Sequence, residues 1–351
     1  MSYDVVVVGG GIGGLTVAAL LSARGVKTCL LERNSQVGGC VARVEFSGHD
    51  FEPGMGLYTS FGPGEIYERV FSELPVKIPE TSLLTGSDNL YSIKGGPATV
   101  AERLAESIKK SGGTLRLNSP VLRLAYDETG QHAIGVDLLS GETVVARRAI
   151  VSNLTVWDTY GKLIGLNRTP LETKKLLKTL QGYGAYLVYA SLEESALERL
   201  PSEHFTISGF TVAISPAGSG PPGKRAVTLK TDTDPTDWFA FQSSEEEYEE
   251  RDQAALEDFW TRLHTALPEL GADVEIIETA NPRTYYDSTR RKLGMVLGLS
   301  SPSVPLNHST SLPNVFMIGD TITSAPRMDA VVESALTLAN QLSIDTAGKA
   351  R

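Results

Sequence analysis

Three glycines near the start of the chain have the spacing of a turn that binds a nucleotide. Gly9, Gly11 and Gly14 follow the pattern G-x-G-x-x-G, directly after a valine run at 5–8 that suits a strand buried on both faces. The first glycine allows a tight turn, the second lets a pyrophosphate approach the backbone, and the third lets the next helix pack against the strand. The helix N-terminus then offers free N–H groups to the phosphates. The alternative is a strand-to-helix turn that binds no nucleotide.

An acidic residue follows where such a site needs a contact to ribose. A second strand at 27–31 ends on Glu32, about twenty residues after the glycines, where a carboxylate can accept hydrogen bonds from both ribose hydroxyls. The helix between the two strands is apolar and is expected to stop at Gly25. A dinucleotide site is therefore predicted from the order of these features: a strand, the glycines, a helix, a second strand and an acidic residue.

A second candidate motif lies far along the chain. The strand at 314–318 ends in Gly319-Asp320, a loop follows at 321–329, and a helix is expected over 330–341. An ordinary strand-end turn is the alternative for Gly319-Asp320.

The composition excludes several classes of protein. The chain has 351 residues, enough for two structural domains, and its net charge of −10 argues against general nucleic-acid affinity. It has two cysteines, no basic leader with a cleavage site, and no long apolar run uninterrupted by glycines. We therefore expect a cytoplasmic protein without disulfides, either free or peripheral to a membrane. The five histidines are scattered, so no metal site is expected.

The remaining segments indicate further helices and strands of both domains. A hairpin is expected at 41–51, an amphipathic helix at 98–110, a strand at 114–124, a meander at 126–143 and a returning strand at 149–153. Later strands are expected at 185–191, 205–214 and 225–230, followed by a helix over 245–267 with an acidic start.

The glycine motif belongs to a longer pattern that resembles a known family. Asp4 precedes it, Glu32-Arg33 ends the second strand, and Gly38-Gly39 follows. This pattern resembles the flavoproteins of the glutathione-reductase-2 type in the amine oxidase superfamily. Across nearly the whole chain, the order of segments is similar to that of phytoene desaturases, carotenoid isomerases and retinol saturases. The resemblance implies noncovalently bound FAD rather than NAD.

The resemblance also implies a fold class and domain limits. The fold class is α/β, with a Rossmann-like FAD-binding domain (a parallel sheet plus a β-meander) and a smaller α+β substrate domain. The expected FAD-binding domain is discontinuous and comprises 1–60, 95–153 and 285–345. The substrate domain is expected at 154–284, and 61–94 is expected to be a shortened lid region.

The resemblance implies roles for individual residues. Val121 is expected to meet the adenine through its backbone, and Asp320 a ribityl or phosphate oxygen. The last helix is expected to point at flavin N1 and O2. An arginine usually follows the double glycine in the family, whereas this chain has Cys40 there and Arg43 three residues later. The complete expected cofactor set is Gly9, Gly11, Ile12, Gly13, Gly14, Glu32, Arg33, Gly38, Gly39, Cys40, Arg43, Gly54, Met55, Val121, Gly319, Asp320, Met328, Asp329 and Ala330.

No catalytic triad is visible, as expected when a flavin supplies the electron chemistry. The resemblance implies desaturation, saturation or isomerisation of an apolar polyene or isoprenoid, with hydride transfer at flavin N5. The expected substrate-cavity residues are Tyr58, Arg283, Tyr285, Tyr286 and Arg327. Two alternatives remain: a flavin-binding partner or chaperone-like subunit with little catalysis, and an amine-oxidase-like enzyme.

The interval 61–94 is short where phytoene desaturases carry a long helical insertion over the polyene tunnel. A second copy, another protein or a membrane surface is therefore expected to cover the cavity beside the flavin. Otherwise, the substrate is smaller than a full-length carotenoid, because each exposed CH₂ costs about 0.8 kcal/mol in water.

Overall fold

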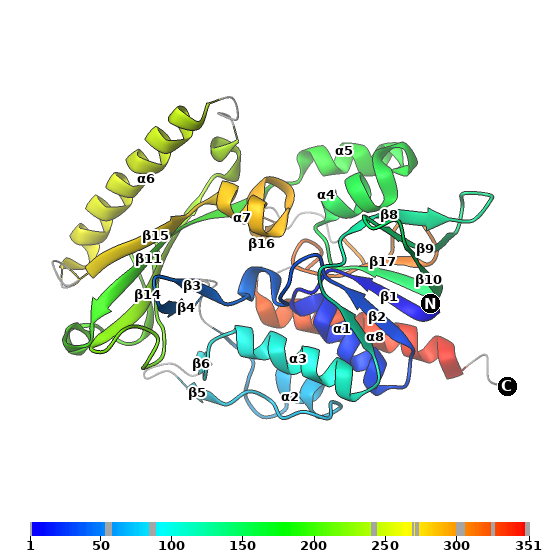
Figure 1. The fold of residues 1–351 in the computed structure, drawn as a ribbon, viewed down its shortest axis with the longest axis horizontal. Coiled ribbons are helices and arrows are strands. Elements are labelled where there is room, and N and C mark those ends of the chain that lie inside the picture. The colour runs from blue at the N-terminus through cyan, green and yellow to red at the C-terminus, as the bar shows by residue number, and fades with distance from the viewer. Residues whose placement is uncertain are drawn as a thin grey trace.

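The fold is built on two β-sheets that lie side by side, each covered by helices (Figure 1). It is seen in a computed structural model that describes residues 2–52, 58–83, 89–239, 244–268, 270, 274–299, 306–323 and 327–347. Within this part of the chain, no helix combines the length and apolarity needed to cross a membrane.

The first sheet has a parallel half and an antiparallel half. In spatial order its strands are β7 (Thr114–Arg116), β2 (Thr28–Leu31), β1 (Ser2–Val8), β10 (Thr143–Ser152), β9 (Ala133–Leu138) and β8 (Val121–Tyr126), with β17 (Val315–Met317) also paired to β10. The start of β10 pairs antiparallel with β9, and its end pairs parallel with β1 and β17. The long strand β10 therefore joins the predicted meander to the predicted parallel sheet.

The valine run in β1 is buried on both faces, as predicted. Val5 and Val7 face one core cluster, whereas Val6 and Val8 face another. The first cluster includes side chains of helices α1 (Ile12–Ala23), α3 (Ala98–Lys110) and α8 (Met328–Ala347). These three helices lie together on one face of the sheet (Figure 1).

Close packing of α1 against β1 depends on one glycine. A Cβ added to Gly14 would lie 2.0 Å from the carbonyl oxygen of Gly9, which no real side chain tolerates. This contact confirms the role predicted for the third glycine of the motif, since only a hydrogen fits between helix and turn.

The opposite face of the first sheet is covered by the segment after β10. This segment contains α4 (Val156–Asp158), a π-helix at Thr159–Gly165 and α5 (Leu171–Thr179). Val156, Tyr160 and Leu163 from it are buried in the second core cluster. Residues 154–180 therefore pack on the first sheet, although the sequence predicted that the substrate domain begins at 154.

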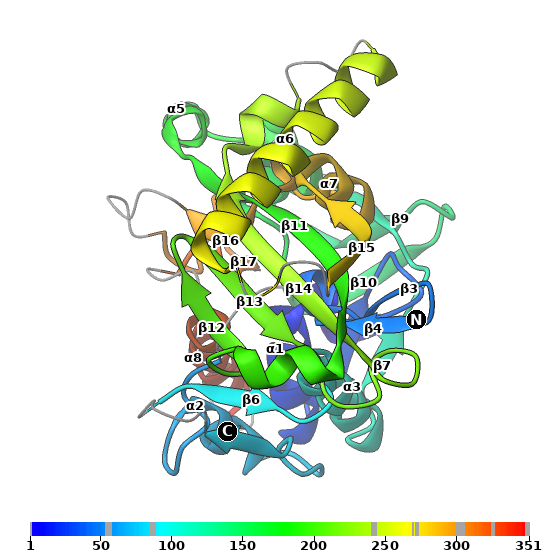
Figure 2. The ribbon, with the colours of Figure 1, turned by 90° about the vertical axis from the view of Figure 1, so that its left-hand side faces the viewer.

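The second sheet is antiparallel. Its strands, in spatial order, are β12 (His204–Ile207), β13 (Phe210–Ile214), β14 (Lys224–Thr233), β11 (Gly182–Glu193) and β15 (Val274–Ala280), with β16 (Val296–Leu299) paired to the start of β11. Helix α6 (Glu245–Ala266) lies across one face of it (Figure 2). Phe259 and Leu263 from α6 are buried there.

Two further segments also pack differently from the predicted domain limits. The hairpin of β3 (Val44–Phe46) and β4 (His49–Phe51) covers the other face of the second sheet, where Phe51 lies 5.0 Å from Tyr189 between ring centroids. Strand β16 belongs to the second sheet but lies in the range 285–345 assigned to the first domain.

The region 61–94 packs against the first domain. It contains α2 (Ile66–Phe71), β5 (Thr81–Leu83) and β6 (Tyr91–Ile93), and it lies beside α3 in Figure 1. Tyr67 and Val70 are buried in the core cluster that also contains α1 and α8. This short region is therefore part of the wall of the first domain, because its apolar side chains are used in that core.

Candidate cofactor site

A cavity of about 460 Å³ lies at the carboxyl end of the parallel strands. Its lining combines the glycine turn at 9–13, the end of β2, the turn at 38–41, the start of β8 and the loop after β17. Among the residues that the structure describes, no lining residue belongs to the second sheet. The crevice beyond the carboxyl ends of parallel strands is the usual ligand position in open α/β sheets.

The two glycine turns form one surface of this cavity. The N–H of Gly38 donates to the carbonyl oxygen of Gly10 at 2.8 Å, and Gly11 and Gly38 form an isolated parallel bridge. Gly38 has a φ of +114°, a conformation that favours glycine. The double glycine is thus held directly against the first motif, and both turns expose backbone at the N-terminus of α1.

Asn153, at the end of β10, packs against the same turn. A Cβ on Gly11 would lie 2.9 Å from its Nδ2, and a Cβ on Gly13 would lie 2.7 Å from its Oδ1. A side chain at either position would therefore require the Asn153 amide to shift. The sequence placed this residue on the returning strand but assigned it no role in the site.

Glu32 is a buried carboxylate that organises the adjoining wall. One of its oxygens accepts the Gly10 N–H at 2.7 Å, and the other accepts the Asn34 N–H at 2.8 Å. Its side chain is buried, and its carbonyl oxygen accepts the N–H of Ser119 at 2.8 Å. Each oxygen keeps a further acceptor position, so the carboxylate can still receive bonds from ribose hydroxyls. Val121 lines the cavity nearby, at the start of β8.

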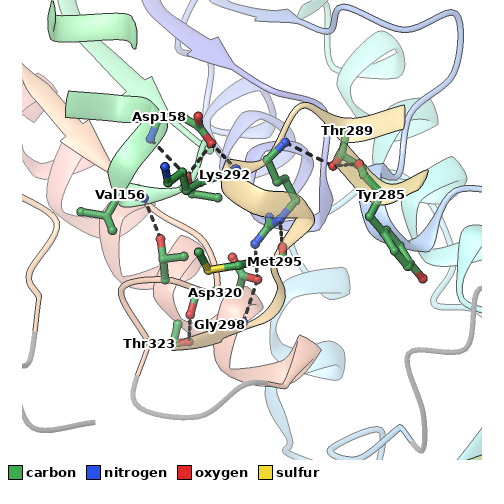
Figure 3. A network of polar contacts seen from close by, with 12 residues as sticks. Val156, Asp158, Tyr285, Thr289, Lys292, Met295, Gly298, Asp320 and Thr323 are labelled. Carbon is green, nitrogen blue, oxygen red and sulfur yellow. Dashed lines mark hydrogen bonds and ion pairs between the residues drawn. The ribbon is translucent and has the colours of Figure 1, made fainter. Parts of the chain in front are cut away.

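Asp320 lies at the centre of a polar network (Figure 3). Its Oδ2 accepts from Nη2 of Arg291 at 2.6 Å and from the Gly298 N–H at 3.1 Å. Nε of Arg291 also donates to the carbonyl oxygen of Met295 at 2.6 Å. This network joins the loop after β17 to the segment that follows α7 (Pro282–Thr289).

Asp329 forms the wall at the start of α8. Its carboxylate accepts from the hydroxyls of Thr59 at 3.0 Å and Ser60 at 2.9 Å, and from Nε of Arg327 at 3.1 Å. Burial acts to raise the pKa of Asp329, but these bonds outweigh it and hold the pKa below its usual value. Tyr58, whose hydroxyl is buried, lines the cavity beside this cluster.

Most of the residues predicted for the site line this one cavity. They are Gly9, Gly11, Ile12, Gly13, Glu32, Arg33, Gly38, Gly39, Cys40, Tyr58, Val121, Gly319, Asp320, Arg327, Met328 and Asp329. Gly14 and Ala330 lie next to lining residues and act through packing and the backbone. Gly54 and Met55 lie outside the described residues.

Four further predicted residues lie away from the cavity. Arg43 bonds to Glu102 at 2.8 Å and to Asp50 at 3.0 Å, beside a smaller cavity of about 130 Å³. It leaves the site because the chain turns into the β3–β4 hairpin immediately after Val41.

The other three lie on or beside α7. Arg283 pairs with Glu245 at 3.0 Å, and the ring of Tyr286 lies 5.6 Å from that of Phe239. Tyr285 is buried in the cluster beneath the β3–β4 hairpin. Each of these side chains is used in packing of the second sheet.

Among the charged residues of the cavity that sequence reasoning missed are Arg291 and Lys162. Arg291 is 16% exposed and paired with Asp320, and Lys162 pairs with Asp158 at 2.8 Å. Neither belongs to a short motif. The double arginine at 290–291 was the visible signal, although nothing in its spacing connects it to Asp320.

Comparisons with known proteins show which proteins this chain resembles in sequence and in fold. The prolycopene isomerase of Daucus carota is 24% identical over 278 residues, which is 72% of this chain and 44% of that protein. The carotenoid 3,4-desaturase of Haloarcula japonica is 44% identical over 69 residues, which is 20% of this chain and 13% of that protein. This chain spans less than half the length of these relatives. A solved oxidoreductase from Methanosarcina mazei has the same fold, with a TM-score of 0.73 at 13% identity over 97% of this chain and 100% of that one.

Family models match almost all of the chain. One, described as an NAD(P)-binding Rossmann-like domain, matches residues 7–74, and one described as flavin containing amine oxidoreductase matches residues 60–343. The cavity fits FAD, because glycine backbone, a buried carboxylate and a helix N-terminus converge on it as a dinucleotide requires. The chain therefore belongs to the flavin containing amine oxidoreductases, and its cofactor is FAD.

Proposed function

We propose that this chain is an FAD-dependent oxidoreductase that desaturates, saturates or isomerises an apolar polyene or isoprenoid. The observation that carries the proposal is the convergence of both sequence motifs on one cavity. The printed names of the relatives, which include isomerases and desaturases of carotenoids and a retinol reductase, support the substrate class.

Within this proposal, the residues of the cavity bind the two ends of FAD. Glu32 accepts hydrogen bonds from the adenosine ribose, and the backbone at Val121 contacts the adenine. The turn at 38–39 and the N-terminus of α1 bind the pyrophosphate, since both present backbone to it. Asp320 accepts from a ribityl hydroxyl.

Asp329 and the N-terminus of α8 form the isoalloxazine end of the site. FAD, when bound, accepts or donates a hydride equivalent at N5. The positive end of the α8 dipole favours negative charge at the neighbouring ring edge. The bonds from Thr59 and Ser60 to Asp329 hold the first turn of α8 in place beside Tyr58.

The test is an anaerobic titration of the purified yellow protein with prolycopene, phytoene and retinol. Bleaching of oxidised flavin, or reoxidation of reduced flavin, identifies which compound reacts and in which direction. Isomerisation is followed by chromatography of prolycopene incubated with the reduced protein. Putrescine serves as the amine-oxidase comparison, since solved putrescine oxidase shares the fold with a TM-score of 0.68.

Two results would contradict the proposal. Flavin reduction by the amine alone would favour an amine oxidase. A stable FAD complex that reacts with none of the compounds would favour a flavin-binding partner subunit.

A further inference from the structure

The segment after the double glycine brings no positive charge to the cavity. Cys40 lines the cavity at the position directly after Gly39, whereas Arg43 is turned away toward Glu102. Burial raises the pKa of the Cys40 thiol, so this side chain is neutral at pH 7. A dinucleotide diphosphate carries two negative charges, and the turn at 38–41 offers it only backbone N–H groups.

Arg291 lies on this same side of the cavity. Both Arg291 and Cys40 line the cavity, and the positive charge of Arg291 opposes the rise in the pKa of Cys40. The positive charge of Arg291 therefore acts on the end of the double-glycine turn, although Arg291 lies about 250 residues further along the chain.

The guanidinium of Arg291 is fixed but not saturated. Nε and Nη2 are bonded to Met295 and Asp320, whereas Nη1 makes no hydrogen bond within the part of the chain that the structure describes. An arginine has five N–H donors in a rigid planar arrangement, so donors remain for a ligand. The ion pair with Asp320 sets the plane in which they lie.

Four other basic residues line the cavity. The guanidinium of Arg33 already donates to Asn34 and to the carbonyl oxygens of Asp287 and Ser288. The remaining three are less suited to hold a ligand in one position, because they are more exposed. Lys162, Arg290 and Arg327 have side chains that are 55%, 48% and 60% exposed, against 16% for Arg291. A charge removed from water interacts more strongly with a phosphate than one that solvent screens.

We propose that Arg291 is a cofactor-positioning residue that faces the diphosphate of FAD and supplies the positive charge absent from position 40. The inference rests on FAD as the cofactor. Asp320 orients the guanidinium through their ion pair at 2.6 Å, and the guanidinium in turn holds the Asp320 carboxylate in place at the cavity.

The experiment compares FAD with riboflavin, which lacks the phosphates. Apoprotein is titrated with each flavin, and the ratio of the two dissociation constants is measured for the wild type, Arg291→Met and Arg283→Met. Arg283 is the matched control, since it is also ion-paired and partly buried but lies outside the cavity. We expect R291M to lower the preference for FAD over riboflavin by about 10- to 100-fold, as for a lost bond to a charged group. R283M is expected to leave the preference unchanged.

The second part of the experiment moves the positive charge from position 291 to position 40. Cys40→Arg in the R291M background returns an arginine to the cavity and is expected to restore most of the preference for FAD. If R291M does not fold, the double variant carries the test, because it must still prefer FAD over riboflavin. An unchanged preference in R291M, or equal losses for FAD and riboflavin, overturns the proposal. Failure of the wild type to bind FAD would instead contradict the cofactor assignment.

Discussion

The carboxylate of Glu52 lies 2.9 Å from Nε2 of His204, and both side chains are 4% exposed. The pair joins the end of the β3–β4 hairpin to the edge strand of the second sheet. The backbone of Glu52 is also bonded, through its N–H to Ser215 at 3.1 Å and through its carbonyl oxygen to Thr228 at 2.5 Å. A segment that starts at the cofactor turn is therefore anchored in the other sheet.

Removing either member of this pair should destabilise the protein strongly. For Glu52→Ala we expect a loss of about 1–3 kcal/mol in the free energy of unfolding, because the buried His204 ring loses its hydrogen-bond partner. Urea unfolding measures it, and Glu245→Ala, which breaks an exposed pair with Arg283, is the control expected to cost less than about 1 kcal/mol. If the two variants have equal free energies of unfolding, the buried pair contributes no more to stability than the exposed pair.

Glu32→Ala should weaken FAD binding by about 1.5–3 kcal/mol, because bonds between the carboxylate and ribose are lost. The same change removes the acceptors for Gly10 and Asn34, so the glycine turn also becomes less ordered. Titration of apoprotein with FAD measures the effect, and Glu142→Ala, at an exposed pair with Arg116, serves as the control. FAD affinity within twofold of the wild type in E32A would reject the assigned role.

Asp329→Asn should reduce stability above pH 4, because an amide oxygen is a weaker acceptor for Thr59, Ser60 and Arg327. The folded-state pKa of Asp329 is lowered, so its contribution is present above the unfolded value and is lost as the pH falls through the folded value. Unfolding curves at pH 7 and pH 3 should therefore separate the wild type from D329N at the higher pH and bring them together at the lower. A constant difference between the two proteins at both values would contradict this.

His308 should make the fold less stable in mild acid. Burial lowers its folded-state pKa below 6.5, although a hydrogen bond from the imidazole to the backbone of Ser334 opposes the change. The unfolded chain then binds a proton more readily than the folded one, so stability is complete above about pH 6.5 and declines as the pH falls below it. His308→Gln should flatten this decline in thermal unfolding between pH 7 and pH 5. His132→Gln, at an exposed position, should leave it unchanged.

The sequence predicted those parts of the site that are formed by residues close to one another along the chain. The motif from Gly9 to Glu32 is contiguous, so its spacing alone indicates the turn, the helix and the acid. The amphipathic helix α3 was predicted for the same reason, since Val100, Leu104 and Ile108 repeat at helical spacing and are buried.

Contacts between distant segments were not predictable in this way. Arg291 reaches Asp320 only because α7 and the loop after β17 fold to the same place, and no local pattern encodes that meeting. Arg43 was expected in the cavity because it is close in sequence to the double glycine. The change of direction at Val41 takes it to Glu102 instead, on the surface of α3.

The strand order of the first sheet has a consequence for how the protein is made on the ribosome. β10 pairs with β1, so that Ser2 lies opposite Val145, 143 residues further along the chain. β10 also pairs with β17, which ends at Met317. The parallel sheet therefore stays incomplete until the chain has emerged as far as Met317, and such long-range pairing forms slowly. Until then the buried faces of β1 and α1 are open to chaperones and to unwanted association with other nascent chains. The nucleotide pocket, although its signature is encoded in the first forty residues, is among the last features of the molecule to form.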